Sequence, residues 1–323
     1  MARRKKQVFD RERPAPPIRA RHLAGWQNKS IEFLAKANNM LEIMREYWPL
    51  TLRQLYYRLV GVQVIENEME EYKRLSRALI KARLQGLIPW ESIEDRVRSY
   101  IERTQYADAD VYVALTKKHF LAHYARDLLQ TQPVSLEVWT EKDAVVGLCE
   151  RAANQYGVPI IVTRGNPSIT FIHELKERVF YEAETNNRPT HIIYLNDFDP
   201  SGMKMLPAVE HTLKTEMGVP ADIFTAERCM LTHQQFVELN LPYSIKAIKW
   251  KDRNAKAFVE QYGHCAAEMD ALEPAAFIDI LDKCIRSNLD LSEFDHQVEL
   301  QDQDADQIAP IRQRALEAID QQD

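Results

Sequence analysis

The sequence predicts two domains of different class, an all-α N-terminal domain followed by an α/β domain with a parallel sheet. Three observations lead to this prediction. The chain has 323 residues, 45% of them apolar, which is enough for two hydrophobic cores. Apolar residues recur at three- and four-residue spacing in the N-terminal third, which is the period of helices. From residue 135 onward, short apolar runs alternate with helical patterns, which is typical of a parallel sheet.

Shifts in composition divide the chain further. The arm at the start is rich in Arg, Lys and Pro and cannot fold alone, so it either lies along a phosphate backbone or is solvated. Acidic residues dominate the other end, and we expect 299–307 to be an acidic linker before a short helix over 308–319. The predicted segments are a flexible basic arm (1–27), a helical DNA-binding domain (28–100), a helical connector (101–133), an α/β domain (134–275) and C-terminal helices with an acidic tail (276–323).

The N-terminal domain is predicted to contain three helices. The first covers residues 30–48, and the second begins after its capping residue, Thr51. Helical spacing in this second helix buries Tyr56 and exposes Tyr57, with Arg53 four residues before Tyr57 on the same face. An exposed arginine and tyrosine side by side suit contact with a phosphate backbone.

The third helix, expected over residues 68–85, carries a basic face and ends at Gly86. Three helices of which the third is basic resemble a winged helix-turn-helix, which lays its third helix against DNA. A basic face can also be merely solvated. Because it occurs together with a basic arm, we expect DNA binding through Lys73, Arg74, Arg77 and Lys81.

The α/β domain is predicted from strands over 136–139, 159–163 and 191–195, separated by helices. Such a βαβαβ order gives right-handed crossovers and a parallel sheet. The loops that follow the strands carry Glu141, Gly165 and Asp197, and all three loops meet at the carboxyl edge of the sheet. A candidate site therefore lies at this edge.

The residues in these loops point to a divalent cation and a phosphate. Glu141, Asp197 and Asp199 offer hard oxygen ligands, the set that Mg²⁺ prefers, and Mn²⁺ is an alternative. Lys142, Arg164 and Gly165 are expected to bind phosphate, the first two by charge and the glycine by allowing close approach of backbone. The simpler interpretation of the Asp-x-Asp turn is that it caps the next helix.

Composition excludes several other classes of protein. The four cysteines are widely spaced without a Cys-x-x-Cys pair, so neither a disulfide framework nor a zinc ribbon is indicated. No apolar run approaches the ~20 residues of a membrane span, and the start lacks the apolar segment of a secretory signal. We therefore expect a cytoplasmic protein that does not associate with membranes.

Three motifs in order, an acid after the first strand, a glycine loop after the second and Asp-x-Asp after the third, resemble the Toprim domain. The strings that begin at Glu141, Gly165 and Asp197, Glu-Lys-Asp-Ala, Gly-Asn-Pro and Asp-Phe-Asp-Pro-Ser-Gly, are similar to those of the topoisomerase VI A subunit and the meiotic double-strand-break transesterase. That family carries a DNA-cleaving tyrosine in a winged-helix domain, in a helix that begins with arginine and ends in paired aromatics. Here the matching residues are Arg53 and Tyr57, while Gln54 stands where the family usually has an acid.

The resemblance implies a homodimer in which the tyrosine of one protomer meets the metal site of the other. It implies a Mg²⁺-dependent enzyme that makes double-strand breaks in DNA by transesterification, leaving a 5′-phosphotyrosyl link, with Tyr57, Arg53 and Glu141 as catalytic residues. The chain has no GxxxxGK[ST] motif, so any ATPase would be a separate partner chain. Two alternatives stay open: a defence-type Toprim endonuclease that cuts by hydrolysis, and a DNA-binding protein without catalytic activity.

Overall fold

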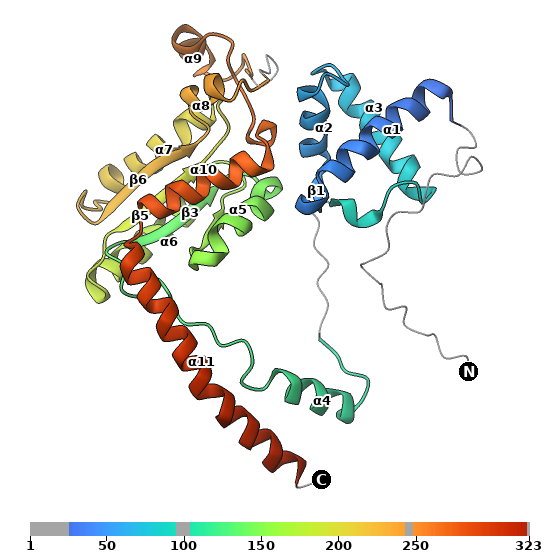
Figure 1. Ribbon diagram of the computed structural model, residues 1–323. Coiled ribbons are helices and arrows are strands. Elements are labelled where there is room, and N and C mark those ends of the chain that lie inside the picture. Colours follow the sequence, from blue (N-terminus) through green and yellow to red (C-terminus); the bar gives the residue numbers. More distant parts are fainter. Residues whose placement is uncertain (1–25, 95–103, 243–247, 322–323) are drawn as a thin grey trace. The chain divides into compact units, whose positions relative to one another are not determined.

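The computed structural model of the chain describes residues 26–94, 104–242 and 248–321 (Figure 1). It consists of two compact units, Met1–Arg96 and Val97–Asp323, and their boundary lies close to the predicted one at residue 100. The predicted basic arm falls outside the described residues except for its last two positions. Across the described part of the chain, no helix combines the length and the apolarity needed to cross a membrane.

The N-terminal unit confirms the three predicted helices, α1 (Asn28–Ile43), α2 (Leu52–Gly61) and α3 (Met69–Leu84). Their apolar faces pack together because residues three and four apart share one side of each helix. Two short strands, β1 (Leu50–Thr51) and β2 (Ile93–Glu94), pair in parallel. The buried apolar side chains of the three helices include Phe33, Leu34, Ala37, Leu41, Leu55, Leu59, Leu75, Leu79 and Ala82.

The start of α2 is fixed by a reciprocal cap. The Thr51 hydroxyl accepts a hydrogen bond from the Gln54 backbone N–H at 3.2 Å, and the Gln54 side chain accepts one from the Thr51 N–H at 2.8 Å. This arrangement satisfies two helix N–H groups that would otherwise lack partners. Gln54 is buried and caps the helix. It stands at the position where the topoisomerase VI A family, which the sequence resembles, usually has an acid.

The C-terminal unit is built on a four-stranded sheet whose neighbours are all parallel, in the order β4-β3-β5-β6. Three strands confirm the prediction: β3 (Ser135–Thr140), β4 (Ile160–Val162) and β5 (Thr190–Leu195). The fourth, β6 (Phe224–Met230), was not predicted because two charged residues, Glu227 and Arg228, interrupt its apolar pattern. The chain is thus a mixed α/β protein with a parallel sheet, together with a helical unit.

Helices cover both faces of this sheet (Figure 1). Helices α6 (Ile169–Thr185) and α7 (Gly202–His211) pack on one face, while α5 (Val146–Ala153) and α10 (Pro274–Ser287) lie together on the other. Side chains on alternate strand positions point to opposite faces, so both layers are buried. The core under α6 and α7 includes Trp139, Ile172, Leu175, Val179, Ile192, Tyr194, Met205, Leu206, Val209 and Phe224.

Two shorter helices lie between β6 and α10 in the chain. Helix α8 (His233–Glu238) begins, as predicted, at Thr232, which forms a second reciprocal cap with Gln235. Helix α9 (Ala255–Tyr262) precedes a 3₁₀ turn, Met269–Ala271. Further short helical turns, at Arg45–Tyr47, Trp90–Ser92, Asp143–Val145, Asn154–Tyr156 and Thr212–Glu216, extend neighbouring elements.

The prediction of an acidic linker near the C-terminus was wrong. Residues 299–307 belong to one continuous helix, α11 (Leu291–Asp320), which accommodates Pro310 in its interior. The acidic stretch consists largely of residues that form helices well when their charge is offset. Arg126 offsets part of it, since its guanidinium pairs with Asp304 at 2.6 Å and donates to Gln297 at 2.8 Å.

The connector helix is shorter than predicted. Within the connector we expected a helix over about 111–129, whereas α4 covers Ala109–His119. It ends shortly before Leu121 and His123, which adopt positive φ angles that a helix cannot contain. The residues that follow lie along α11, where the Tyr124 hydroxyl donates to Asp304 at 2.6 Å. Hydrogen bonding to another helix thus replaces hydrogen bonding within this one.

Candidate active site

The acids predicted from the sequence come together at the carboxyl edge of the sheet. Glu141 follows β3, and Asp197 and Asp199 follow β5, the strand paired with β3. Burial raises the pKa of Glu141 to about 7, and the charge of Asp197 and, less strongly, of Asp199 adds to this effect. The three carboxylates therefore lie close enough for their charges to repel one another in a partly buried setting.

Asp199 caps the helix after the Asp-x-Asp turn and also belongs to the acidic cluster. Its Oδ1 accepts a hydrogen bond from the Gly202 backbone N–H at 2.6 Å, which caps the start of α7. Burial nevertheless raises the pKa of Asp199, since this hydrogen bond and the nearby Lys142 and Lys249 offset burial and the charge of Asp197 only in part. The cap and the acidic cluster share one carboxylate.

Asp197 is held through both of its oxygens. Oδ1 accepts the Met269 backbone N–H at 2.8 Å, and Oδ2 pairs with the Lys142 ammonium at 2.6 Å. The side chain is almost fully buried. A buried carboxylate needs such partners, because burying an unpaired charge costs several kcal/mol, on the order of a whole domain's stability.

We expected Lys142 to bind phosphate. In the structure it lies among three carboxylates instead. Besides Asp197, its Nζ lies 3.1 Å from Asp270 Oδ2 and 3.3 Å from Glu268 Oε2. Burial lowers the pKa of Lys142, but Asp197, Asp270 and Glu268 more than offset this and raise it well above its usual range. Lys142 is therefore a charged counter-ion inside the acidic cluster.

Glu268 and Asp270 were not predicted as site residues. They reach the cluster because residues 266–272 dock on the Asp-x-Asp turn, where Phe198 and Ala267 form an antiparallel bridge with two N–H···O bonds of 2.9 Å. Asp270 is fully buried, and its Oδ1 has no hydrogen-bond partner among the described residues. The only sequence signal was the acidic pair itself, two residues apart.

Arg228, on the strand that was not predicted, fixes the backbone of the Asp-x-Asp turn. Its guanidinium donates to the carbonyl oxygens of Asp197 at 2.6 Å, Leu231 at 2.7 Å and Gly202 at 2.9 Å. Burial lowers the pKa of Arg228, and the nearby acids offset part of this effect. An arginine remains charged under such conditions, so it adds positive potential beneath the acids.

The glycine loop after β4 has the backbone freedom that was predicted for it. Gly165 has φ +98°, and a Cβ built there would meet nothing within 4 Å. Arg164 precedes it, also at positive φ, and its guanidinium pairs with Asp143 at 3.0 Å while 72% of its side chain stays exposed. The loop thus leaves an exposed cation and an unobstructed backbone, both suited to an anion.

The predicted exposure of Tyr57 was wrong. Tyr57 is only 5% exposed, and its ring packs edge to face on Tyr56 with centroids 5.2 Å apart. The buried residues of α2 run consecutively from Gln54 to Leu59, so helical spacing alone could not identify an exposed face. The Tyr56 hydroxyl lies 3.1 Å from Asn67 Oδ1 and 3.2 Å from the Glu68 carbonyl oxygen, so Tyr56 has a structural role. Arg53, the other residue predicted to be exposed, is exposed.

The basic face predicted on α3 is exposed but partly neutralised. Lys73 pairs with Glu70 at 3.0 Å and Arg74 pairs with Glu71 at 3.1 Å, while Arg77 is exposed. Lys81 sits over the ring of Trp26, 4.4 Å from its centroid. Exposed ion pairs of this kind are weak, so Lys73, Arg74 and Arg77 remain available to a polyanion, whereas Lys81 is half-buried.

The carboxylates of the cluster have the chemistry, but not the arrangement, of a divalent-cation site. No group of three or more His, Cys, Asp and Glu side chains has the arrangement of a metal site in the residues that the structure describes. The chemistry of the donors does fit Mg²⁺, because the raised pKa values of Glu141 and Asp199 express repulsion and burial that a bound cation would relieve. Lys142 supplies a single charge against the carboxylates of the cluster, Glu141, Asp197, Asp199, Glu268 and Asp270.

We expect the stability of the protein to depend on pH through Glu141. Its pKa rises from 4.5 to about 7 on folding, so its contribution favours the folded state at low pH and is lost as the pH rises through 7. Glu141→Gln cannot ionise and should therefore be more stable than the wild type at pH 8, by on the order of 2 kcal/mol, with little difference at pH 5. Urea unfolding at the two pH values without divalent cations tests this. An equal difference at both pH values would contradict the assigned pKa.

Comparison of the chain with protein-family models and with curated proteins gives no match.

Proposed function

We propose that this protein is a Mg²⁺-dependent, DNA-cleaving enzyme of the Toprim class. The observation that carries the proposal is the mutual electrostatic interaction of Glu141, Asp197 and Asp199 at the carboxyl edge of a parallel sheet. In this proposal the α/β unit is a Toprim domain and the N-terminal unit is a winged-helix DNA-binding domain. Glu141, Asp197 and Asp199 would hold the metal, which when bound supplies charge stabilisation at the phosphate.

The residues of the chain have distinct parts in the proposed reaction. The Tyr57 oxygen attacks a backbone phosphorus, a new P–O bond forms, and the bond from phosphorus to the 3′ oxygen breaks. The tyrosine proton goes to a base and the leaving 3′ oxygen takes up a proton, which gives a 5′-phosphotyrosyl link and a 3′-hydroxyl. Glu141 takes part in this step as a ligand that would hold the metal, whose charge would lower its raised pKa.

The remaining predicted residues would bind the substrate. Arg53 neutralises the phosphate next to Tyr57, and the exposed cations of α3 follow the duplex backbone. Arg164 and Gly165 contact phosphate at the edge of the sheet. We further propose a cytoplasmic homodimer on double-stranded DNA, in which Tyr57 of one protomer acts with the acids of the other, with a separate ATPase chain as a possible partner.

One observation favours a second candidate, hydrolysis by a Toprim nuclease. Tyr57 is nearly inaccessible at 5% exposure, whereas a water molecule needs no such side chain to reach phosphorus. In this candidate the acids and the metal act as before, and Tyr57 is structural. The two candidates predict different DNA ends.

The decisive experiment incubates purified protein and Mg²⁺ or Mn²⁺ with supercoiled plasmid DNA, which reports cutting, and with an end-labelled linear duplex, which reports the ends. Reactions are stopped in detergent and analysed with and without protease. Wild type, Tyr57→Phe, Tyr56→Phe and Glu141→Ala are compared. Transesterification predicts protein-linked 5′ ends that require Tyr57 and Glu141 but not Tyr56. Tyr56→Phe is the matched control because it loses the same hydroxyl group from the neighbouring ring.

Each outcome separates the candidates. If Tyr57→Phe still cuts DNA and leaves free ends, while Glu141→Ala does not cut, the reaction is hydrolysis. Cutting that survives Glu141→Ala would overturn the metal-site proposal itself. DNA binding without cutting under any of these conditions would favour a binding protein without catalytic activity.

A further inference from the structure

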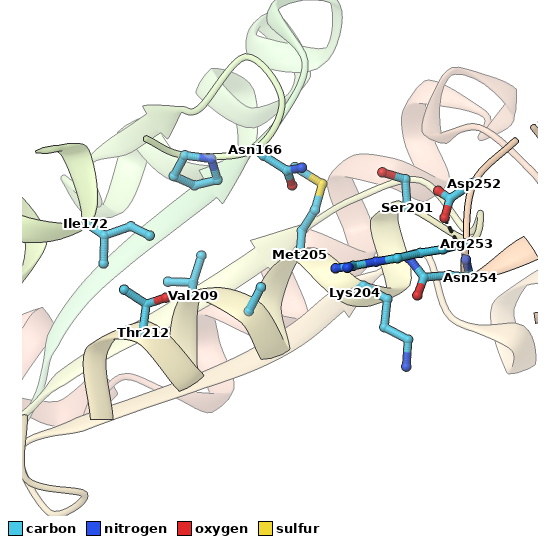
Figure 2. Close-up of a pocket in the computed structure, with 12 residues that line it drawn as sticks. Asn166, Ile172, Ser201, Lys204, Met205, Val209, Thr212, Asp252, Arg253 and Asn254 are labelled. Carbon is cyan, nitrogen blue, oxygen red and sulfur yellow. Dashed lines mark hydrogen bonds between the residues drawn. The ribbon is translucent and has the colours of Figure 1, made fainter. Parts of the chain in front are cut away.

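A cavity of about 380 Å³ opens beside the acidic cluster, between the glycine loop, α7 and the segment 252–254. Cavities of roughly 300–1,000 Å³ are the size of small-molecule sites in proteins. Figure 2 shows its lining, in which the Arg253 side chain extends from its segment toward α7.

The charges of the lining suit a phosphate. Lys204 and Arg253 are exposed cations from two different elements. The single acid, Asp252, already accepts the backbone N–H of Asn254 at 2.8 Å, so it is occupied in holding its own turn. The two cations exceed the single carboxylate by one positive charge, which favours an anionic group in the cavity.

The other lining residues suit a flat heterocycle. Ile172, Met205 and Val209 are buried and form an apolar floor. The sulfur of Met205 is fixed by the buried amide of Asn196, 3.1 Å away, and a thioether packs favourably on aromatic rings. Asn166 and Asn254 each offer an amide that both donates and accepts, which matches the edges of nucleobases.

The cavity is lined by direct sequence neighbours of the proposed cleavage-site residues. Ser201 and Gly202 belong to the turn that carries Asp199, and Asn166 follows Gly165 directly in the glycine loop. The charge of Lys249, just before the segment 252–254, acts on Asp199 as well. A strand whose phosphate lies at the acids would therefore bring its next nucleotide to this cavity.

From these contacts we infer that the cavity binds a nucleoside phosphate, namely a nucleotide of the DNA strand adjacent to the phosphate that is cut. The inference rests on the proposed function for the source of the nucleotide. The base packs on Met205, and Lys204 and Arg253 hold the flanking phosphate. Contacts of this kind fix the strand relative to the acids, and they make these residues positioning residues for the cleavage.

Binding without divalent cations tests the inference independently of cleavage. Ala208→Trp fills the cavity from an exposed position of α7, and Arg253→Ala removes one cation. Ala305→Trp, at an exposed alanine of α11, and Lys283→Ala, at an exposed lysine of α10, are the matched controls. The probes are a fluorescein-labelled duplex followed by anisotropy, and deoxyadenosine and thymidine 5′-monophosphates followed by calorimetry.

We expect Ala208→Trp and Arg253→Ala each to weaken duplex binding about tenfold, while the two controls bind as the wild type does. If both variants lose binding of the free monophosphates but keep duplex binding, the cavity still takes a nucleoside phosphate, and its source is the free nucleotide. Unchanged binding of every probe by two folded variants overturns the inference. A protein that binds through the cavity but never cuts DNA would refute the proposed function alone.

Discussion

Replacing Lys142 by methionine should lower the free energy of unfolding by about 3–5 kcal/mol, the usual cost of removing one partner from a buried ion pair. Lys142 is the ammonium that Asp197, Asp270 and Glu268 share, at 2.6, 3.1 and 3.3 Å. Without it, these carboxylates repel one another in a buried setting and take up protons. Urea unfolding at neutral pH measures the loss. Lys283→Met is the control, because that lysine is exposed and pairs with the exposed Asp279.

The same variant gives a test of metal binding that does not depend on activity. If the acids bind Mg²⁺, a millimolar concentration should stabilise Lys142→Met more than the wild type, since the cation replaces the missing charge and binds only the folded state. The stabilisation should grow with the logarithm of Mg²⁺ concentration. A variant that is destabilised but insensitive to Mg²⁺ and Mn²⁺ would show that the cluster is a structural ion network without a metal.

Gly202→Ala should both destabilise the protein and impair the proposed cleavage. A Cβ at this position would clash with the backbone oxygen of Asp197 and would lie 3.2 Å from Asp199 Oδ1. The backbone must shift, at a cost of about 1–3 kcal/mol. Because both aspartates belong to the turn that moves, we expect DNA cleavage to fall by on the order of a hundredfold.

Gly61→Ala is the matched control for this prediction. It is a helical glycine at the end of α2, and a Cβ there would meet nothing within 4 Å. It should leave cleavage unchanged and stabilise the protein by about 0.5 kcal/mol, because alanine restricts the unfolded chain more than glycine does. Thermal unfolding and the supercoiled-DNA assay on both variants decide the matter. Equal behaviour of the two variants would show that the turn tolerates a side chain.

The sequence was sufficient for the parts of the fold that depend on local pattern. The strand before Asp197 is a continuous apolar run, and its neighbours follow from the alternation of strands and helices. Strand β6 was missed because a charged residue such as Arg228 is not expected in an inner strand. Its half-buried guanidinium is accommodated by carbonyl oxygens of other segments, which accept its hydrogen bonds. Helix α11 was cut short for a related reason: Arg126, from a distant part of the chain, offsets the charge of Asp304.

A similar limit applies to the candidate site. Glu141, Asp197 and Asp199 could be predicted together because a parallel sheet brings the ends of its strands to one edge. The inward position of Lys142 could not, because it depends on Glu268 and Asp270, more than a hundred residues away. The burial of Tyr57 was equally hidden, since helical periodicity identifies one buried face and α2 has more than one.

The long-range contacts of the Asp-x-Asp turn set an order of events during synthesis of the chain. The hydrogen bond from the Met269 N–H to Asp197 joins residues 72 positions apart, and the bridge between Phe198 and Ala267 spans a similar separation. Contacts of such separation form late in folding, because a long loop must close first. A nascent chain that has not reached residue 266 lacks two of the carboxylates and the main-chain partners of the turn. The acidic cluster therefore assembles only after the segment that carries Ala267 and Met269 has been synthesised and has docked on the turn.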